Sequence, residues 1–510
     1  MSTLLKPLDS VFLAVEEDEN LMNIGGLYVY PSNKLTNYNL HFDCKYFTTK
    51  PMQNETCRYI FNNESLPKPE DVKQQMLDFV QFLGKTSRLN SKIHTTASLF
   101  DQPKWVRDDD FHMDNHFSTV HLPEGRNAKR DLADLVGQSF STRFALHSPL
   151  WDATYYTNII LHPSDSDSPA TRQAALFIKC HHSLGDGQAF VRGLLRYVSS
   201  LSPSGDLDTL QYTGGLHNST KKTPIDGRRS MVSQAAHILS QTLFFIYGTR
   251  ACLTPTHTGT LIALLTLVKL HLRKRESMAR PTRQKQKQLA WTSGASVPLA
   301  DVKRIKKAFG VTVNDVLVAS YAHGLARFLR ERDELKDDSF WFFVPTSARK
   351  PGDWSISNQT VGYFVELPVH TDPVAMLKST SAALTRAKTS TMPFFGWFWL
   401  HLTFHFPFLI PRRVLKASAG LFHCVLTNVP GPSERIAWAG QDIHEIVGAI
   451  PQPGGPNSIG ASIYSYAGGV SVSTVMCRDP EGGTGVYANG AAQRVCECFE
   501  ESLGQLGKKI

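Results

Sequence analysis

Two spacings of hydrophobic residues recur along the chain, one typical of strands and one typical of helices. Residues 174–180 form a short apolar run that predicts a buried strand, and residues 188–201 carry apolar side chains at helical spacing. In the second half, residues 340–344 predict another buried strand and residues 302–309 predict a basic helix. Because strand-like and helix-like segments alternate in both halves, the pattern predicts a layered α/β fold.

The middle of the chain has a different character. Residues 202–227 are rich in Ser, Gly, Thr and Asp, which is typical of a linker. Two apolar segments follow, 235–245 and 260–272, and the second is too short for the roughly 20 residues that cross a bilayer. A basic run comes next and ends at Lys287. The pattern fits a helix lying on an anionic membrane surface, and it equally fits a buried connector helix before a solvated basic loop.

Composition and charge narrow the class of protein. The 510 residues exceed a single ordinary core, so two domains or two fused halves are expected. Hydrophobic residues make up 42% and charged residues 19%, a balance typical of a globular protein. The net charge of +9 would suit nucleic acid, an anionic membrane surface or an anionic substrate. The basic run has no interleaved aromatic residues, so we expect no nucleic-acid partner.

The eight cysteines are spread thinly, and Cys496 and Cys498 are the only close pair. The sequence has no CxxC motif, so neither a zinc site nor a disulfide framework is expected, and a reducing compartment is favoured. The N-terminus lacks the apolar stretch of a signal peptide. Sequons begin at Asn54, Asn63, Asn218 and Asn358, but such triplets often arise by chance.

The sharpest polar constellation is His-His-Ser-Leu-Gly-Asp-Gly, from His181 to Gly187, between the predicted strand and the predicted helix. Neighbouring side chains of a strand point to opposite faces, so only one of the two histidines should face a given cleft. We assign that place to His182, as a general base. Asp186 can fix the tautomer of the imidazole, or it can pair with an arginine and hold the loop, and the sequence leaves both roles open.

The motifs around this run are more specific than the run itself. The sequence resembles the bifunctional wax ester synthase/acyl-CoA:diacylglycerol acyltransferase family over nearly its whole length. HHxxxDG alone is shared by the wider superfamily of CoA-dependent acyltransferases and peptide-synthesis condensation domains. The further motifs are Pro7-Leu8-Asp9, Asn23-Ile24-Gly25-Gly26, Pro149-Leu150-Trp151, Asn314-Asp315, Asn428-Val429-Pro430-Gly431-Pro432 and Ser465-Tyr466-Ala467-Gly468-Gly469.

That resemblance implies an α/β fold of two chloramphenicol-acetyltransferase-like halves, joined by a crossover segment, with an active-site tunnel between them. We place the N-terminal half at residues 1–205, the linker and crossover at 206–288, and the C-terminal half at 289–510. Two stretches depart from the family pattern, the polar insert-like segment 33–69 and the long crossover 234–288. These departures concern loop geometry and membrane attachment, and they leave the chemistry unchanged.

The segment 393–410 is unusually rich in Phe and Trp. His401, His405 and Pro407 within it argue against a simple transmembrane helix. Three interpretations stay open: packed core, the lining of an acyl-chain tunnel, and a patch that faces a membrane.

The chemistry follows from the reacting groups. A thioester is already activated, because a thiol with a pKa of about 8.5 is a good leaving group. An alcohol is too weak an acid to ionise near neutral pH, so a base must take its proton as its oxygen attacks the acyl carbonyl. We expect His182 to do this without an acyl-enzyme intermediate. Cys180 has the same strand parity as His182, but the reaction does not need it as a nucleophile.

The remaining site residues come from the resemblance. We expect His181 and Asp186 to complete the catalytic group by holding His182 in place. Asn314 is the candidate donor to the oxyanion, and a helix N-cap is its alternative role. No metal and no cofactor is expected, because acyl-CoA is a co-substrate. The residues assigned to substrate-binding or structural motifs are Gly187, Asp315, Asn428, Pro430 and Gly431.

The expected activity is transfer of a fatty acyl group from acyl-CoA to a long-chain alcohol, to diacylglycerol, or to both. A sterol, a terpenoid alcohol or an amine is the alternative acceptor, and a lipid-associated scaffold without turnover is the non-enzymatic alternative. We expect a membrane or lipid-droplet surface as a further partner. The expected location is the cytoplasmic face of the endoplasmic reticulum or the droplet surface, with peripheral or weakly integral attachment.

Overall fold

The structure of the protein is a computed structural model. It describes residues 3–4, 23–31, 66–84, 88–94, 104–123, 128–161, 171–201, 286–349, 353–389, 422–452, 458–479 and 487–510. Several predictions therefore lie outside the described residues: the Pro7-Leu8-Asp9 motif, most of the segment 33–69, the crossover up to residue 285, the aromatic segment 393–410, and the sequons at Asn54, Asn63 and Asn218.

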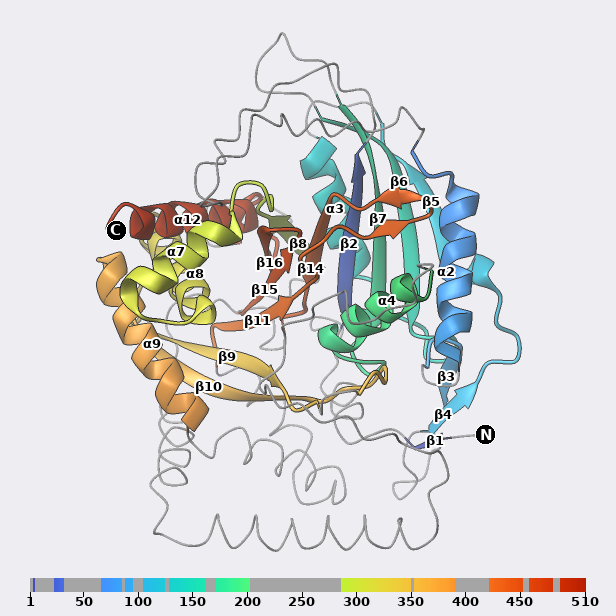
Figure 1. Ribbon diagram of the computed structural model, residues 1–510, viewed down its shortest axis with the longest axis horizontal. Helices are drawn as coiled ribbons and strands as arrows, with labels where there is room; N and C mark the ends of the chain where they lie inside the picture. Colours follow the sequence, from blue (N-terminus) through green and yellow to red (C-terminus); the bar gives the residue numbers. More distant parts are fainter. Residues whose placement is uncertain are drawn as a thin grey trace, which may run out of the picture.

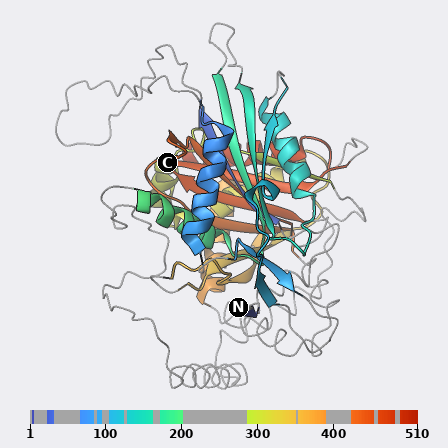
Figure 2. The ribbon, with the colours of Figure 1, turned by 90° about the vertical axis from the view of Figure 1, so that its right-hand side faces the viewer.

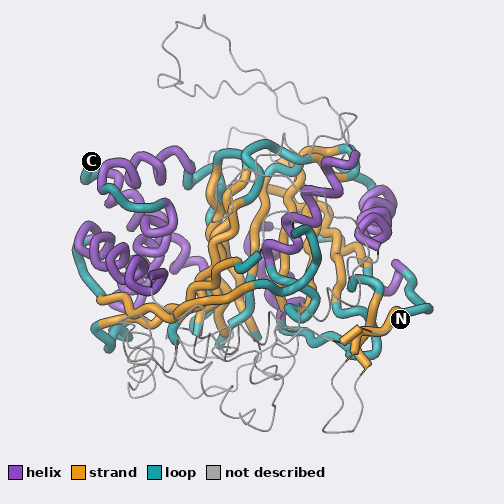
Figure 3. The backbone as a smooth tube through the Cα atoms, turned by 60° about the horizontal axis from the view of Figure 1, so that its bottom comes forward, coloured by secondary structure: helices purple, strands orange, loops and turns teal. Residues whose placement is uncertain are grey.

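Two β-sheets lie side by side in the molecule, with helices packed against their faces and, in the C-terminal half, gathered at one outer side (Figures 1 and 3). The N-terminal sheet has the strand order β14-β2-β7-β6-β5. Its strands are β2 (Asn23–Pro31), β5 (Phe117–His121), β6 (Trp151–Leu161), β7 (Thr171–His181) and β14 (Glu445–Ala449). The C-terminal sheet has the order β10-β9-β11-β15-β16-β8. Its strands are β8 (Lys287–Trp291), β9 (Ser339–Ser347), β10 (Thr360–Pro368), β11 (Cys424–Pro430), β15 (Ile459–Tyr466) and β16 (Gly469–Cys477).

Helices lie on both faces of the N-terminal sheet. Ala174 and Leu176 of β7 pack with the helices at 69–83 and 187–201, whereas Ala175 and Phe177 point to the opposite face and pack with the helix at 128–140. The helices of the N-terminal half are α2 (Pro69–Leu83), α3 (Ala128–Phe140) and α4 (Gly187–Leu201), and α2 faces the viewer in Figure 2. Those of the C-terminal half are α7 (Leu299–Phe309), α8 (Val313–Arg330), α9 (Pro373–Thr389) and α12 (Ala491–Gly507). The described small elements are β1 (Thr3–Leu4), β3 (Ser91–His94), β4 (Lys104–Arg107), a 3₁₀ turn (Met113–Asn115), β12 (Ala437–Trp438) and β13 (Gln441–Asp442).

The core of the C-terminal half is built around α8, which is buried on nearly every side. Phe340 and Phe342 are two residues apart on β9, so both side chains point to the same face of the sheet and pack with residues of α8. Gly324 lets α8 lie against α12, since a Cβ there would come within 2.7 Å of the Phe499 backbone nitrogen.

The two halves exchange elements. Strand β14 belongs to the C-terminal part of the chain, yet it pairs antiparallel with β2 and so extends the N-terminal sheet. Strand β8 follows the crossover and packs against α3, where Gly137 lies close to the Lys287 carbonyl. The expected division at residues 205 and 288 thus follows the covalent order, whereas the folded halves are interlocked.

The predicted strands and helices that fall on described residues are confirmed. The runs 174–180 and 340–344 lie in β7 and β9, and the patterns at 188–201 and 302–309 lie in α4 and α7. The Ser465–Gly469 motif resembles a C-terminal strand of the family, but in the structure only its ends are strand, in β15 and β16. Ala467 and Gly468, with φ of 47° and 82°, form a turn between β15 and β16, because the chain reverses there.

Two findings bear on the membrane. Among the described residues, none of the helices combines the length and the apolar character needed to cross a bilayer. Lys287, the end of the predicted basic run, is buried in β8, so its ammonium group is not part of a surface. The rest of that run lies outside the described residues.

Candidate active site

The run from His181 to Gly187 connects β7 to α4 at the edge where the two halves meet. The His181 amide donates to the Leu150 carbonyl at 2.8 Å, and the Leu184 amide donates to the His181 carbonyl at 3.0 Å, so the chain turns sharply after the strand. His181 is 1% exposed, whereas His182 is half-buried. The two neighbouring side chains thus differ in burial at the end of β7.

His181 takes part in the turn itself. Its Nδ1 lies 2.8 Å from the Ser183 hydroxyl and 3.1 Å from the Ser183 backbone nitrogen, which donates to it. Ser183 is fully buried. The His181 ring therefore bonds to the backbone of the loop that carries His182.

Asp186 is the N-cap of α4 and the partner of an arginine. Its carboxylate accepts from the Ala189 amide at 2.8 Å and from Arg349 Nη2 at 3.1 and 3.3 Å. It also accepts from the Gln359 amide at 2.7 Å and from the Thr360 hydroxyl at 3.0 Å. Of the two roles that the sequence left open for Asp186, these contacts favour the pair with an arginine.

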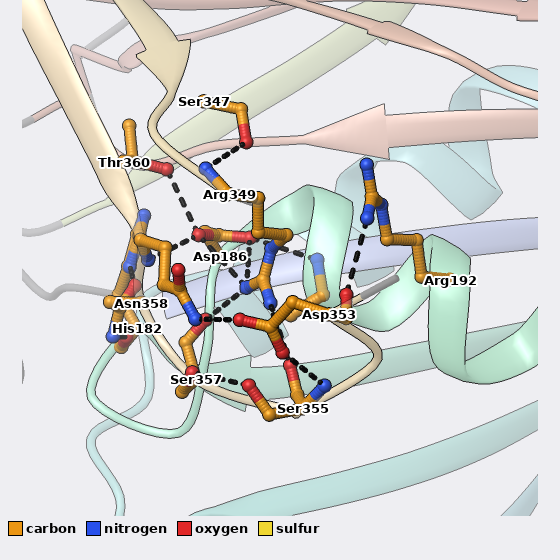
Figure 4. Close-up of polar contacts among 12 residues, drawn as sticks. His182, Asp186, Arg192, Ser347, Arg349, Asp353, Ser355, Ser357, Asn358 and Thr360 are labelled. Carbon is orange, nitrogen blue, oxygen red and sulfur yellow. Dashed lines mark hydrogen bonds and ion pairs between the residues drawn. The ribbon is translucent and has the colours of Figure 1, made fainter. Parts of the chain in front are cut away.

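Apart from the Ala189 amide, these donors to Asp186 come from one segment of the other half, between β9 and β10. We call residues 347–360 the β9–β10 connection; residues 350–352 within it lie outside the described residues. In Figure 1 this connection reaches beneath α4, and Figure 4 shows its polar side chains gathered around Asp186. Ile356 packs into the loop from the same side, since a Cβ on Gly185 or Gly193 would lie 3.2 or 2.7 Å from its side chain.

His182 is bound by Asn358 of the same connection (Figure 4). The Asn358 Oδ1 lies 2.9 Å from His182 Nδ1, and Asn358 Nδ2 donates to the His182 carbonyl at 2.6 Å. Asn358 is 5% exposed. The Asn358 amide thus hydrogen-bonds both the ring and the backbone of His182, although the two residues are 176 positions apart in the chain.

Burial lowers the pKa of His182 from its ordinary value, because a buried site disfavours the charged imidazolium. A hydrogen bond to the residue's own backbone, the charge of Asp186 and the bond to Asn358 act in the opposite direction, while His181 adds to the lowering. The net direction is downward, so His182 is neutral at neutral pH. A neutral imidazole is the form that can accept a proton.

Asn314 lies in the first turn of α8, but it is not the N-cap of that helix. Thr312 is the N-cap: its hydroxyl accepts from the Asp315 amide, and the Asp315 carboxylate accepts from the Thr312 amide, which is a capping box. The alternative role that we gave Asn314 is therefore wrong. Asp315 is buried, also accepts from Ser381, and lies 3.6 Å from Lys388, so it holds the helix end.

The structure brings two of the predicted motifs into contact. Asn428 on β11 donates from Nδ2 to Asn314 Oδ1 at 3.3 Å. Pro430 ends β11, and the Gly431 amide donates to the Ser465 carbonyl at 2.9 Å. A Cβ on Gly431 would overlap that carbonyl and the Tyr464 ring, so only glycine fits.

Gly187 connects this region to the histidine loop. It is the first residue of α4, and a Cβ there would lie 3.7 Å from a methyl group of Val429 on β11. The HHxxxDG loop, β11 and the β9–β10 connection therefore meet at the junction of the halves.

Cys180 is fully buried beside the loop, and burial raises the pKa of its thiol well above the ordinary value. The five cysteines that the structure describes are free and buried. Among the residues that it describes, no three His, Cys, Asp or Glu side chains are grouped so that they could hold a metal ion.

Asn358 and Arg349 were not found by sequence reasoning. Asn358 was noticed only as the first residue of a sequon, and its burial against His182 is incompatible with its carrying a glycan as placed. Arg349 lies 163 positions from Asp186, and nothing local marks it as the partner. One hint of Arg349 lay in the sequence: Asp186 could pair with an arginine of unspecified position.

The fold and the site together define the class of protein. Two sheet-and-helix halves that meet at an HHxxxDG loop form a fold that this chain shares with solved acyltransferase and condensation-domain structures. A solved wax ester synthase/diacylglycerol acyltransferase from Marinobacter aquaeolei VT8 has the same fold, with a TM-score of 0.56 and 20% identity over 99% of each chain. The first condensation domain of the calcium-dependent antibiotic synthetase also has a TM-score of 0.56, at 11% identity, over 98% of this chain and 96% of its own.

Sequence comparison identifies the family. Residues 5–317 match the wax ester synthase/diacylglycerol acyltransferase catalytic domain, and residues 356–507 match the C-terminal domain of the same family. The chain belongs to this family and is an O-acyltransferase. The O-acyltransferase WSD of Acinetobacter baylyi is 24% identical over 93% of this chain and 92% of its own. A Mycobacterium tuberculosis protein provisionally named a diacylglycerol O-acyltransferase is 26% identical over 78% of this chain and 77% of its own.

Proposed function

We propose that the protein transfers a fatty acyl group from acyl-CoA to the hydroxyl of a long-chain alcohol or of diacylglycerol, with His182 as the general base. The observation that carries the proposal is the half-buried, neutral His182 ring, held by Asn358 where the two halves meet. The family's two named activities, wax ester synthesis and diacylglycerol acylation, support these acceptors.

The reaction needs one proton acceptor and no covalent enzyme intermediate. His182 takes the proton of the acceptor hydroxyl as its oxygen attacks the thioester carbonyl carbon. The C–S bond of the tetrahedral intermediate then breaks, and the CoA thiolate takes the proton back from His182. The products are an ester and CoA with a free thiol, and the histidine returns to its neutral form.

Asn314 is the proposed donor to the oxyanion. Its Oδ1 accepts from Asn428 Nδ2, so the NH₂ group is the part of the Asn314 amide that would donate to the oxyanion. An NH₂ group held in this way needs no reorganisation as charge develops on the carbonyl oxygen. Loss of one such donor typically lowers kcat by about 10²–10³.

The decisive experiment compares two histidine variants of the purified protein. His182→Ala should abolish both CoA release and ester formation from labelled acyl-CoA. His121→Ala removes an exposed histidine on β5, bonded to Thr157, and should leave activity unchanged. Activity near that of the parent protein in folded His182→Ala would refute the base assignment.

The acceptor is identified with a panel that contains a long-chain alcohol, diacylglycerol, a sterol, a terpenoid alcohol and an amine. Ester formation with either of the first two, above the rate with the others, supports the proposal. Turnover restricted to the last three would replace the acceptor class, and absence of CoA release with every acceptor would favour a non-catalytic scaffold.

Peripheral attachment to the cytoplasmic face of the endoplasmic reticulum or to a lipid droplet is part of the proposal. It is supported by the low solubility of both acceptors in water, the net charge of +9 and the apolar segment 260–272 followed by a basic run. The protein should sediment with anionic liposomes at low salt and release at high salt. Failure to bind liposomes of any composition would refute the attachment.

A further inference from the structure

Asn358 uses both ends of its amide on one histidine. Its Oδ1 lies 2.9 Å from His182 Nδ1, and its Nδ2 lies 2.6 Å from the His182 carbonyl oxygen. Both atoms of the amide are therefore engaged within one residue of the HHxxxDG loop.

The pair of contacts fixes which way the amide faces. A carbonyl oxygen only accepts, so the atom of Asn358 that lies beside the His182 carbonyl must be the NH₂ nitrogen. The amide oxygen then faces His182 Nδ1, and because that oxygen can only accept, Nδ1 must carry the proton. In this tautomer the lone pair of the neutral ring is on Nε2.

We propose that Asn358 is a positioning residue, which holds His182 with its proton on Nδ1 so that Nε2 is the atom that takes the acceptor's proton. The inference rests on the proposed function, because it assigns the atom of the general base and the group that sets it. Asn358 belongs to the C-terminal half and His182 to the N-terminal half, so contact between the halves sets the tautomer.

The carboxylate in the motif is engaged elsewhere. Asp186 accepts from Arg349, from the Gln359 and Ala189 amides and from Thr360, and none of these contacts reaches the His182 ring. Orientation of a catalytic histidine is often the work of a carboxylate. In this protein the neutral amide of Asn358 orients the histidine instead.

The neutral partner has a consequence for the pH range of the base. A carboxylate bonded to Nδ1 would stabilise the imidazolium and raise the pKa of His182, whereas an amide does so far less. The charged and titratable groups near the His182 loop are Asp186 with Arg349 beside it, His181, and Arg88, whose guanidinium donates to the Ser183 carbonyl at 3.4 Å. With an amide as the partner, His182 stays neutral down to lower pH.

The connection that carries Asn358 is itself braced. Arg349 Nη1 donates to the Ser355 carbonyl at 2.8 Å, and the Ser355 amide donates to Asp353 at 2.9 Å. The Gln359 side chain donates to the same aspartate, and Arg349 donates to the Ser357 carbonyl. These bonds flank Asn358 on both sides and keep its amide in one place.

Three variants test the proposal. Asn358→Ala removes both contacts and should lower kcat about 10- to 100-fold, part of what a general base contributes, with little change in KM. Asn358→Asp places a carboxylate beside Nδ1, so the acid limb of the pH–kcat profile should move to higher pH. Asn115→Ala is the matched control, because Asn115 is an exposed asparagine in the 3₁₀ turn Met113–Asn115, outside the β9–β10 connection, and its loss should leave kcat within about twofold.

The tautomer of His182 can also be measured directly by NMR, without any turnover of substrate. In protein labelled with ¹⁵N-histidine, the His182 signals are assigned by their loss in His182→Ala, and their shifts report which ring nitrogen is protonated. A proton on Nδ1 supports the proposal even if no acceptor is turned over. A proton on Nε2, or an acid limb in Asn358→Asp that coincides with that of the parent protein, would overturn it.

Discussion

The sharpest stability prediction concerns Asp186→Ala. Asp186 is 4% exposed and its partner, the Arg349 side chain, is fully buried, so the substitution removes the nearer carboxylate of a buried guanidinium and leaves Asp353, 3.9 Å away, as the other one. Breaking a buried pair from one side typically costs about 3–5 kcal/mol. The substitution also removes the acceptor of the Ala189 amide, the N-cap of α4, which alone is worth about 1 kcal/mol.

This free energy converts to a modest shift of the melting temperature. The entropy of unfolding is about 2.1 cal/mol/K per residue, or about 1 kcal/mol/K for a chain of this length, so the combined loss of about 4–6 kcal/mol should lower the melting temperature by about 4–6 °C. Scanning calorimetry or thermal-shift fluorescence measures it directly. Asp372→Ala is the matched control, because Asp372 is an exposed aspartate that accepts from the Ala375 amide at the start of α9. Its loss should cost about 1 °C.

Activity decides between the structural and the catalytic role of Asp186. If Asp186 supports the loop through Arg349, Asp186→Ala should keep measurable turnover below its melting temperature. The acid limb of its pH profile should move to lower pH, because the charge of Asp186 raises the pKa of His182. An unchanged melting temperature together with activity as low as that of His182→Ala would refute the reasoning and make Asp186 a catalytic residue.

Three further predictions follow from the site. The pKa of His182 is lowered, so kcat should stay constant until the pH falls below about 6.5, the ordinary histidine value. A pH–rate profile measures this, and an acid limb above that pH would contradict it. Cys180→Ala should retain most activity and iodoacetamide should not inhibit, because burial raises the pKa of the Cys180 thiol; inactivation that tracks alkylation of Cys180 would contradict this. Thr312→Ala should lower the melting temperature by about 1 °C with kcat unchanged, since it removes the N-cap of α8 and no group proposed to touch substrate; a large drop in kcat in the folded variant would contradict it.

The parts of the site that the sequence could predict are local. A strand, a sharp turn and a helix follow one another within residues 171–201, and the two-residue period of the strand separates His181 from His182. The N-cap of α8 is also a local feature. Thr312 stands three residues before Asp315, which is the spacing of a capping box, and this spacing indicates Thr312 rather than Asn314 as the N-cap.

The parts that it could not predict depend on the exchange between the halves. Nothing in the sequence around 445–449 says that β14 adds to a sheet whose other strands lie before residue 182. The same holds for Asn358 and Arg349, whose partners lie 176 and 163 positions away. Polar residues in a connection between two strands look like solvated loop, and only the tertiary fold shows that these two are buried.

The HHxxxDG run is therefore one half of a site, and the β9–β10 connection is the other. The connection keeps two electrostatic tasks apart: Arg349 balances the charge of Asp186, and the neutral amide of Asn358 orients His182. If the carboxylate were bonded to the ring instead, the imidazolium would be stabilised and the base would be protonated at a higher pH. Asn358 and Arg349 both come from the opposite half. A shift of the interface would therefore remove the hydrogen bond that orients His182 and, at the same time, separate Asp186 from its arginine. The integrity of the interface and the competence of the base are thus linked through a single connection.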